Sequence, residues 1–485
     1  MRISKLGNIK KQKVKVYSLA ILIIVLFFNI TGCSNAKKEA TEGLALSSDY
    51  EITATLEPYS KRLEHTTTAR VSNNGASSTR ELYFHLYGNL FKTDTEYISV
   101  ISVSDENGNS IPFELRDNEQ LVLLTLNETL DVGEVATVIF SCIVTIPAME
   151  LIYGIAQNGE IHLSYFYPQL AVYGTNGWDT NPMNEILDGR HLESSDFRIT
   201  IQVPSEYEIA ANGTVVSNET SNGQTTYVFQ AESRREIVLI AFTDFAHAER
   251  SVGNTKILGY INSKHSQVDI DRLMDAVVFS MEFYNRIYIE YPYETLIITN
   301  GGIPARGFGA SMEYSGLFTV VMESAFEKTV FHEMAHQWFY ALVGNDENVE
   351  PWLDEAFAEF SAMLCYEIFD ADTAERYWEI QEIQSEQVKN FMNDAYVNIS
   401  VAESANEDNP FLFHYIFYAR GSLFLKELMD AIGRDEFLSI LSEYCKTYTF
   451  KIATTQGFLS ILRENTTVDI ESIVDKYVDS HRVQA

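Results

Sequence analysis

The chain has 485 residues, of which 46% are apolar, a length that suits about two or three globular domains. Lysine and arginine number 35 against 68 aspartate and glutamate residues, so the formal net charge is −33. Such an acidic chain would repel the phosphates of nucleic acid, and we exclude nucleic acid as a partner.

The first 33 residues are typical of an export signal. Six basic residues precede the apolar segment 17–30, which is shorter than the roughly 20 residues of a membrane-spanning helix. The segment ends in Ile30-Thr31-Gly32-Cys33, which resembles a bacterial lipobox, in which the cysteine becomes the lipidated first residue. We expect lipidation at Cys33 and a place in the bacterial cell envelope, on the outer face of the cytoplasmic membrane. The alternative is a plain signal anchor with Cys33 as a bystander.

Cleavage would leave 29 basic and 68 acidic residues, a net charge of −39. An anionic bilayer would repel that charge, so we expect the membrane link to be lipid and not a basic protein face. Residues 34–48 are small, polar and charged, as in a flexible tether. Cys142, Cys365 and Cys445 form no CxxC pair, and we expect them to be buried free thiols.

Two regions follow the tether. Residues 49–250 contain short alternating apolar runs separated by Asn-Gly turns, which predicts an antiparallel β-domain. Residues 251–485 begin with two strand-like runs, 256–261 and 295–299, around a helical stretch at 270–288. Helical patterns then continue almost to the end, at 326–342, 353–369, 372–392, 411–432, 434–447 and 470–480. We therefore expect a multidomain α and β protein whose second domain is mostly helical, and no additional C-terminal domain.

The strongest motif is His332-Glu333-Met334-Ala335-His336. Histidines four residues apart on a helix lie on one face, close enough to bind one metal ion. Glu333 projects beside them, where it can reach a water on the metal. A catalytic zinc ion takes three protein ligands and keeps its fourth position open for water.

Glu355 is the candidate third ligand. It lies 19 residues beyond His336, after a break at Gly344 and Pro351, near the start of the next predicted helix. Two histidines and one carboxylate on facing helices would complete the site with water. The H-E-x-x-H motif can occur by chance, but helix, break and helix in this order predict one Zn2+ ion bound by His332, His336 and Glu355.

These motifs resemble the aminopeptidase-N-like zinc metallopeptidases of the gluzincin clan. That family carries H-E-x-x-H, eighteen residues, and then Glu within a run like W-L-N-E-G-F-A. Here the run 352–358 reads W-L-D-E-A-F-A, with Asp354 for the usual Asn and Ala356 for the usual Gly. Runs at 81–87, 165–173 and 451–459 also resemble bacterial members. The resemblance implies a saddle-like β-domain followed by a thermolysin-like catalytic domain.

The resemblance implies roles for two further residues. Ala310-Ser311-Met312-Glu313-Tyr314 matches the family's G-x-M-E-N motif, whose Glu binds the free N-terminal ammonium of the substrate. This chain departs from the motif at its first and last positions. The run 418–421, Y-A-R-G, matches Y-x-K-G with Arg420 for Lys. In the family, that Tyr donates a hydrogen bond to the oxyanion formed during cleavage.

These features predict an extracytoplasmic zinc aminopeptidase acting on peptides with a free N-terminus. Glu333 would take the proton from the attacking water and deliver it to the leaving amine, while Tyr418 stabilises the oxyanion and Glu313 holds the substrate amine. One alternative is a thermolysin-like endopeptidase, which the departures around Glu313 permit. The other is a lipid-anchored binding protein on a decayed peptidase scaffold, against which the intact ligands, Glu333 and Tyr418 argue.

Overall fold

The structure is a computed structural model that describes residues 45–91, 97–149, 152–174, 176–182, 189–301, 311–322, 326–392 and 396–483. The predicted signal, Cys33 and most of the tether lie outside these residues. Strand β1 begins at Leu46, inside the predicted tether. Among the described residues no helix is both long and apolar enough to cross a membrane. The proposed domain boundaries remain predictions.

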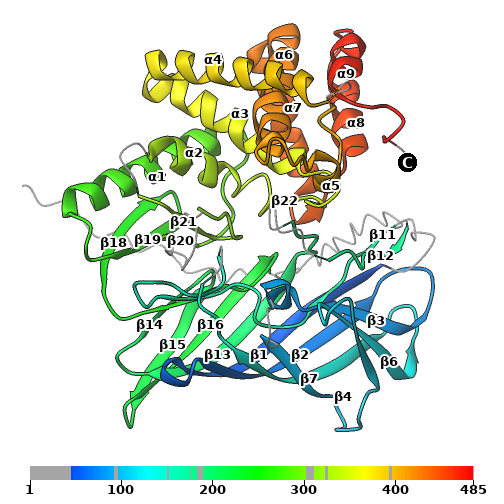
Figure 1. Cartoon of the computed structure of the whole chain (residues 1–485), viewed down its shortest axis with the longest axis vertical. Coiled ribbons are helices and arrows are strands. Elements are labelled where there is room, and N and C mark those ends of the chain that lie inside the picture. The colour runs from blue at the N-terminus through cyan, green and yellow to red at the C-terminus, as the bar shows by residue number, and fades with distance from the viewer. Residues whose placement is uncertain are drawn as a thin grey trace, which may run out of the picture. The chain divides into compact units, whose positions relative to one another are not determined.

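The β-rich region is built on a seven-stranded sheet (Figure 1). Buried and exposed side chains alternate along its first strand, because successive residues of a strand face opposite sides of a sheet. The strands, in sheet order, are β15 (Thr214–Ser221), β16 (Gln224–Arg234), β13 (Ser195–Pro204), β1 (Leu46–Glu57), β2 (Arg62–Asn73), β7 (Val135–Thr145) and β4 (Ile98–Ser104). Neighbouring strands are antiparallel except β1 and β13, which are parallel.

Smaller sheets complete the β-rich region. One contains β10 (Gln169–Leu170), β3 (Thr79–His85), β6 (Leu121–Leu130) and β5 (Phe113–Arg116), and another contains β14 (Glu208–Ala211), β17 (Leu239–Phe242), β9 (Ile161–Leu163) and β8 (Gly154–Ile155). Strands β11 (Tyr173–Gly174) and β12 (Gly177–Trp178) form a two-stranded ribbon. Most of the buried apolar residues of this region belong to one core cluster.

A four-stranded sheet opens the second region, in the order β18 (Phe245–Val252), β19 (Thr255–Asn262), β20 (Thr295–Asn300) and β21 (Leu317–Val320). Helix α1 (Gln267–Ile287) connects β19 to β20, which run parallel as expected for a helical crossover. The helices that follow are α2 (Glu327–Ala335), α3 (Trp352–Phe369), α4 (Ala371–Gln387), α5 (Val401–Ser404), α6 (Gly421–Ile432), α7 (Arg434–Tyr448), α8 (Thr455–Asn465) and α9 (Glu471–Tyr477). They share a second core cluster with the apolar face of α1.

The predicted order of a β-rich region before a mostly helical one is confirmed (Figure 1). The prediction of one helix over 326–342 is wrong at its end, because α2 stops at Ala335. The side chains beyond it are held by other elements: Gln337 donates to the carbonyl oxygen of Tyr314, and Trp338 donates to that of Ile289. Tyr340, with a φ of 138°, then turns the chain toward the short strand β22 (Val343–Gly344).

Two further expectations can be compared with the structure. Cys142, Cys365 and Cys445 are buried free cysteines, as predicted. The helix predicted over 411–432 is divided, because residues 414–420 form a π-helix, η4 (His414–Arg420), that continues into α6. Single π turns inside α-helices occur frequently at functional sites, and this one contains Tyr418.

Candidate metal centre

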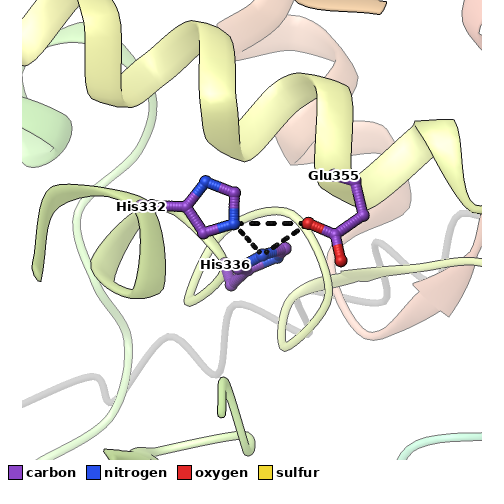
Figure 2. Close-up of side chains that lie close together, drawn as sticks. All are labelled: His332, His336 and Glu355. Atoms are coloured by element: carbon purple, nitrogen blue, oxygen red, sulfur yellow. Dashed lines mark hydrogen bonds and ion pairs between the residues drawn. The ribbon is translucent and has the colours of Figure 1, made fainter. Parts of the chain in front are cut away.

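Helices α2 and α3 bring His332, His336 and Glu355 together. Their ligand atoms all lie within 4.8 Å of one another (Figure 2). His332 lies in the last turn of α2 and His336 caps its C-terminal end, so their imidazoles point to the same side. Glu355 lies in the first turn of α3, which begins after Pro351. A proline at the start of a helix leaves no intrahelical hydrogen bond unmade.

The spacing of the three atoms fits a tetrahedral metal. The Nε2 atoms of His332 and His336 are 3.0 Å apart, and each lies 3.3 Å from Oε2 of Glu355. Zinc bonds of about 2.0–2.2 Å at tetrahedral angles would place ligand atoms roughly 3.3–3.6 Å apart. Oε2 of Glu355 is buried beside the two imidazoles, and a buried carboxylate is unfavourable unless a cation lies next to it. The predicted zinc ligands therefore form a cradle of the right size and chemistry.

Hydrogen bonds fix the orientation of both imidazoles. Nδ1 of His336 lies 3.0 Å from the carbonyl oxygen of Phe339, which can only accept, so Nδ1 donates. Nδ1 of His332 lies 3.2 Å from Oε2 of Glu359 and donates in the same way. When neutral, a ring held in this way turns its Nε2 lone pair toward the centre. Metal-binding histidines usually donate their second N–H to a carboxylate or a carbonyl in this manner.

Sequence reasoning missed Glu359, which anchors the back of the site. It lies one helical turn beyond Glu355 on α3 and is almost fully buried. Besides His332, it accepts hydrogen bonds from Lys328 at 2.8 Å and from Gln381. The four-residue spacing from Glu355 is a signal that could have pointed to it, because such residues share a helix face.

Charge balance in the centre depends on a cation. Burial alone would lower the pKa of His332, but hydrogen bonds to Glu355 and Glu359 raise it to about 9. Burial opposes the charge of Glu355, yet hydrogen bonds to the two imidazoles hold its pKa well below the ordinary value. Without metal, protons on the imidazoles balance the carboxylates. A bound metal ion would displace those protons, which is the usual linkage between metal binding and pH.

Glu333 lies beside the ligands, as predicted from its position in the motif. Its side chain is 6% exposed, and its Oε2 is buried with no hydrogen-bond partner among the residues that the structure describes. Burial raises the pKa of Glu333 to about 8, with a further contribution from the charge of Glu313. An unpaired buried carboxyl with a raised pKa is the kind of group that serves as a general base or acid.

Tyr418 reaches the centre from η4. Its hydroxyl donates to Oε1 of Glu355 at 2.5 Å, and its ring stacks on His332 with centroids 5.5 Å apart. Gly421 makes this approach possible, because a Cβ there would lie 2.5 Å from the Cβ of Ala356 on α3. Arg420, the departure from the usual Lys, instead donates to the carbonyl oxygen of Lys476 and lies over the ring of Tyr477.

Glu313 follows the short bridge between Met312 and Thr319 beside β21. Its side chain is 13% exposed, and its Oε1 accepts a hydrogen bond of 2.6 Å from Arg190. Arg190 precedes β13 in the β-rich region and carried no local signal, since it lies 123 residues before Glu313. The carboxylate predicted to bind the substrate amine is thus already paired with a protein cation.

A family model matches part of the chain. Residues 273–477 match the model of the Peptidase family M1 domain. This part of the chain is a peptidase family M1 domain. The predicted membership of the aminopeptidase-N-like family is confirmed. The matched range includes Glu313, both histidines, Glu333, Glu355 and Tyr418.

Several M1 aminopeptidases are similar in sequence. Aminopeptidase N of Lactococcus lactis subsp. cremoris (strain MG1363) is 23% identical over 374 residues, which cover 68% of this chain and 43% of that protein. Glutamyl aminopeptidase of Sus scrofa is 26% identical over 309 residues, covering 59% of this chain and 32% of that protein. The chain spans about a third of the length of the first curated relatives it matches.

Solved structures show the same fold. An M1 zinc metallopeptidase variant from Deinococcus radiodurans, bound to a Tyr-Ser-Ala substrate, superposes with a TM-score of 0.67 at 19% identity. The match covers 90% of this chain and 94% of that chain. The M1 zinc metallopeptidase from the same organism gives a TM-score of 0.63 at 19% identity, covering 91% and 94%. The likeness extends over both the β-rich region and the M1 domain.

Proposed function

We propose that this chain is a zinc-dependent aminopeptidase that removes N-terminal residues from peptides. The spacing of the ligand atoms of His332, His336 and Glu355, with an unpaired Glu333 beside them, carries the proposal. Structural neighbours of the same fold are zinc metallopeptidases, and sequence relatives are aminopeptidases. When bound, zinc would supply Lewis-acid chemistry that makes water a nucleophile at neutral pH and polarises the scissile carbonyl.

Glu333 is the proposed general base. It is held beside the ligands by the same helix turn as His332, and its buried Oε2 is free to accept a proton. The carboxylate takes a proton from the attacking water, and the resulting carboxylic acid delivers it to the nitrogen of the leaving amine. This accounts for both proton transfers of peptide hydrolysis with one residue.

Tyr418 is the proposed oxyanion donor. Burial and the neighbouring Glu355 raise the pKa of Tyr418 well above its ordinary value, so its hydroxyl keeps its proton. The hydroxyl lies next to a ligand of the proposed metal, where it can turn from Glu355 to the oxygen of the scissile carbonyl. A fixed donor at that oxygen stabilises the charge that develops during attack.

Glu313 is the proposed anchor for the N-terminal ammonium of the peptide. Its carboxylate is partly exposed and contributes to the electrostatic field at Glu333, His336 and Tyr418. Anchoring the amine there would place the first peptide bond, and not a later one, at the reactive centre. The endopeptidase alternative stays open, because the pairing of Glu313 with Arg190 weakens this anchor.

The test is hydrolysis by residues 34–485, purified with zinc, of a set of tripeptides with free N-termini and of the same set N-acetylated. An aminopeptidase trims one residue from the free peptides. Cleavage depends on Glu333, so Glu333→Gln should lower kcat by about 10²- to 10⁴-fold while zinc content stays the same. Zinc-loaded Glu333→Gln protein with full activity would overturn the mechanism. Internal cleavage of both sets would establish the endopeptidase instead.

We also propose that the protein is lipid-anchored through Cys33 on the outer face of the cytoplasmic membrane of a bacterium. The proposal rests on the lipobox-like run before Cys33 and on the acidity of the remaining chain, which gives no electrostatic attachment to an anionic bilayer. Detergent-phase partitioning of the full chain expressed in bacteria tests it. The native protein should enter the detergent phase and Cys33→Ser should not; equal partitioning would contradict the anchor.

A further inference from the structure

The predicted amine anchor, Glu313, is bound by the guanidinium of Arg190. The contact between Nη2 of Arg190 and Oε1 of Glu313 is 2.6 Å long, as in a strong charge-assisted hydrogen bond. The Arg190 side chain is 1% exposed, so water does not screen this pair as it would a surface pair. A substrate ammonium would therefore meet a carboxylate that already has a cationic partner.

Arg190 is also held in place by Glu347. Its backbone N–H donates to Oε2 of Glu347 at 3.0 Å, and its carbonyl oxygen accepts from the backbone N–H of Glu347 at 3.1 Å. Its Nε and Nη2 also donate to the Glu347 carboxylate, both at 3.3 Å. A Cβ on Gly189 would lie 2.5 Å from Oδ1 of Asn348, so glycine lets the two segments approach.

The charge of Arg190 is divided between two carboxylates. Its guanidinium lies 4.4 Å from the ring centroid of Tyr340. Burial opposes its charge, but Glu347 and, less strongly, Glu313 raise its pKa well above the ordinary value, so it stays protonated. Burial raises the pKa of Glu347 well above its ordinary value, and the charge of Arg190 opposes that shift. Glu347 and Glu313 both accept from this one guanidinium, so a substrate ammonium would have to share Glu313 with it.

We propose that Arg190 is a specificity-determining residue that acts through Glu313. This inference rests on the proposed peptidase function. Arg190 competes with the N-terminal ammonium for the Glu313 carboxylate and places a positive charge beside it. The site therefore binds a free N-terminus less tightly than it would if Glu313 were unpaired, and its preference for free over N-blocked peptides is lower than it would be without Arg190. Arg190 acts through its contact with Glu313 and does not take part in the bond-breaking step.

The competition between Arg190 and the substrate ammonium predicts opposite effects for two variants of Arg190 and Glu347. Replacing both Arg190 and Glu347 by glutamine removes one charge of each sign and leaves Glu313 to the substrate. Replacing Glu347 alone leaves Glu313 as the only carboxylate bound to Arg190 in this group. The double variant should bind free N-termini more tightly than the native protein, whereas Glu347→Gln should bind them more weakly. Simple loss of structure would weaken binding in both variants.

Equilibrium binding tests this without catalysis. Zinc-loaded protein carrying Glu333→Gln would be titrated calorimetrically with a set of X-Ala-Ala tripeptides, free and N-acetylated. One charge-assisted hydrogen bond corresponds to roughly tenfold or more in affinity, so the ratio of free to acetylated affinity should rise by about that factor in Arg190→Gln/Glu347→Gln. The ratio should fall in Glu347→Gln. If the ratio of free to acetylated affinity is unchanged or reduced in the double variant, the proposal is overturned. A reduced ratio would show that Arg190 only orients Glu313.

Hydrolysis separates this inference from the proposed function. With Glu333 restored, the double variant should lower KM for free peptides about tenfold with little change in kcat, because the substitutions affect binding of the amine. A native protein that cleaves neither set, with zinc present, removes the proposed function while the binding titration still decides the role of Arg190. Equal changes in kcat and KM for free and blocked peptides would assign Arg190 to the fold alone.

Discussion

Nδ1 of His332 lies 3.2 Å from Oε2 of Glu359, an almost fully buried carboxylate that also accepts hydrogen bonds from Lys328 and Gln381. The contact joins α2 to α3 behind the metal ligands and fixes which nitrogen of His332 faces the centre. Glu359 therefore belongs to the metal site although it does not point into it.

Glu359→Gln should weaken zinc binding by about 10- to 100-fold, the usual effect of losing a carboxylate that orients a metal-binding histidine. Competition with a zinc-selective chelator measures the dissociation constant. Glu375→Gln, on the exposed face of α4, is the matched control and should leave it unchanged. Native affinity in Glu359→Gln would show that packing alone orients His332.

Metal removal should lower the melting temperature. The carboxylate of Glu355 loses its cation, and the imidazoles must take up protons to balance it. A ligand present at about 1,000 times its dissociation constant stabilises the folded state by roughly 4 kcal/mol. Thermal unfolding with and without a chelator measures the difference. In His336→Ala, which lacks a ligand, the chelator should have little effect, and an equal shift there would point to a different metal site.

The sequence predicts most of the metal centre because its signals are local. His332 and His336 lie on one helix, and Glu355 lies near the start of the next helix, after a break. The helical period and the order of these elements are therefore enough to predict the three ligands. The end of α2 could not be predicted in this way. The residues Gln337 and Trp338 fit a helical pattern, but in the structure their side chains donate hydrogen bonds to carbonyl oxygens of distant segments. Tertiary contacts there outweigh the helical pattern.

Arg190, in contrast, could not be predicted from the sequence. No motif marks it, and its partners Glu313 and Glu347 follow 123 and 157 residues later. The three charges come together because the segment before β13 packs against two others, the link between α2 and α3 with Glu347 and the segment before β21 with Glu313. Long-range ion pairs of this kind depend on tertiary approach, which periodicity and spacing do not describe.

His191 offers a pH-dependent link between the same two segments. Its Nδ1 lies 2.8 Å from Asp179 and 3.5 Å from Asp346. Burial alone would lower the pKa of His191, but the hydrogen bond to Asp179 and the charge of Asp346 raise it above its ordinary value. A histidine with a raised folded pKa stabilises the fold fully below its unfolded pKa of about 6.5, and that stabilisation is lost as the pH rises through the folded pKa.

His191→Asn should therefore lower the melting temperature more near pH 6 than near pH 9, because only the protonated imidazole gains from both carboxylates. A charged hydrogen bond of this kind contributes about 1.5–3 kcal/mol. Melting curves of native and variant protein at both pH values give the comparison. His481→Asn, at an exposed position, is the control and should show no such difference. A loss of stability that is the same at both pH values would mean that His191 acts by packing.

Tyr418→Phe should lower kcat by about 10²- to 10³-fold, the usual effect of removing one oxyanion donor, and leave KM nearly unchanged. The phenylalanine ring keeps the stacking on His332, so only the hydroxyl at Glu355 is lost. Tyr415→Phe removes a hydroxyl from the same π-helix and should keep full activity. Zinc content must be measured in both proteins, because the hydroxyl of Tyr418 also touches a proposed ligand. A fall in activity that follows zinc loss would make Tyr418 a support for Glu355, whereas a fall at full zinc occupancy would place its hydroxyl at the developing oxyanion.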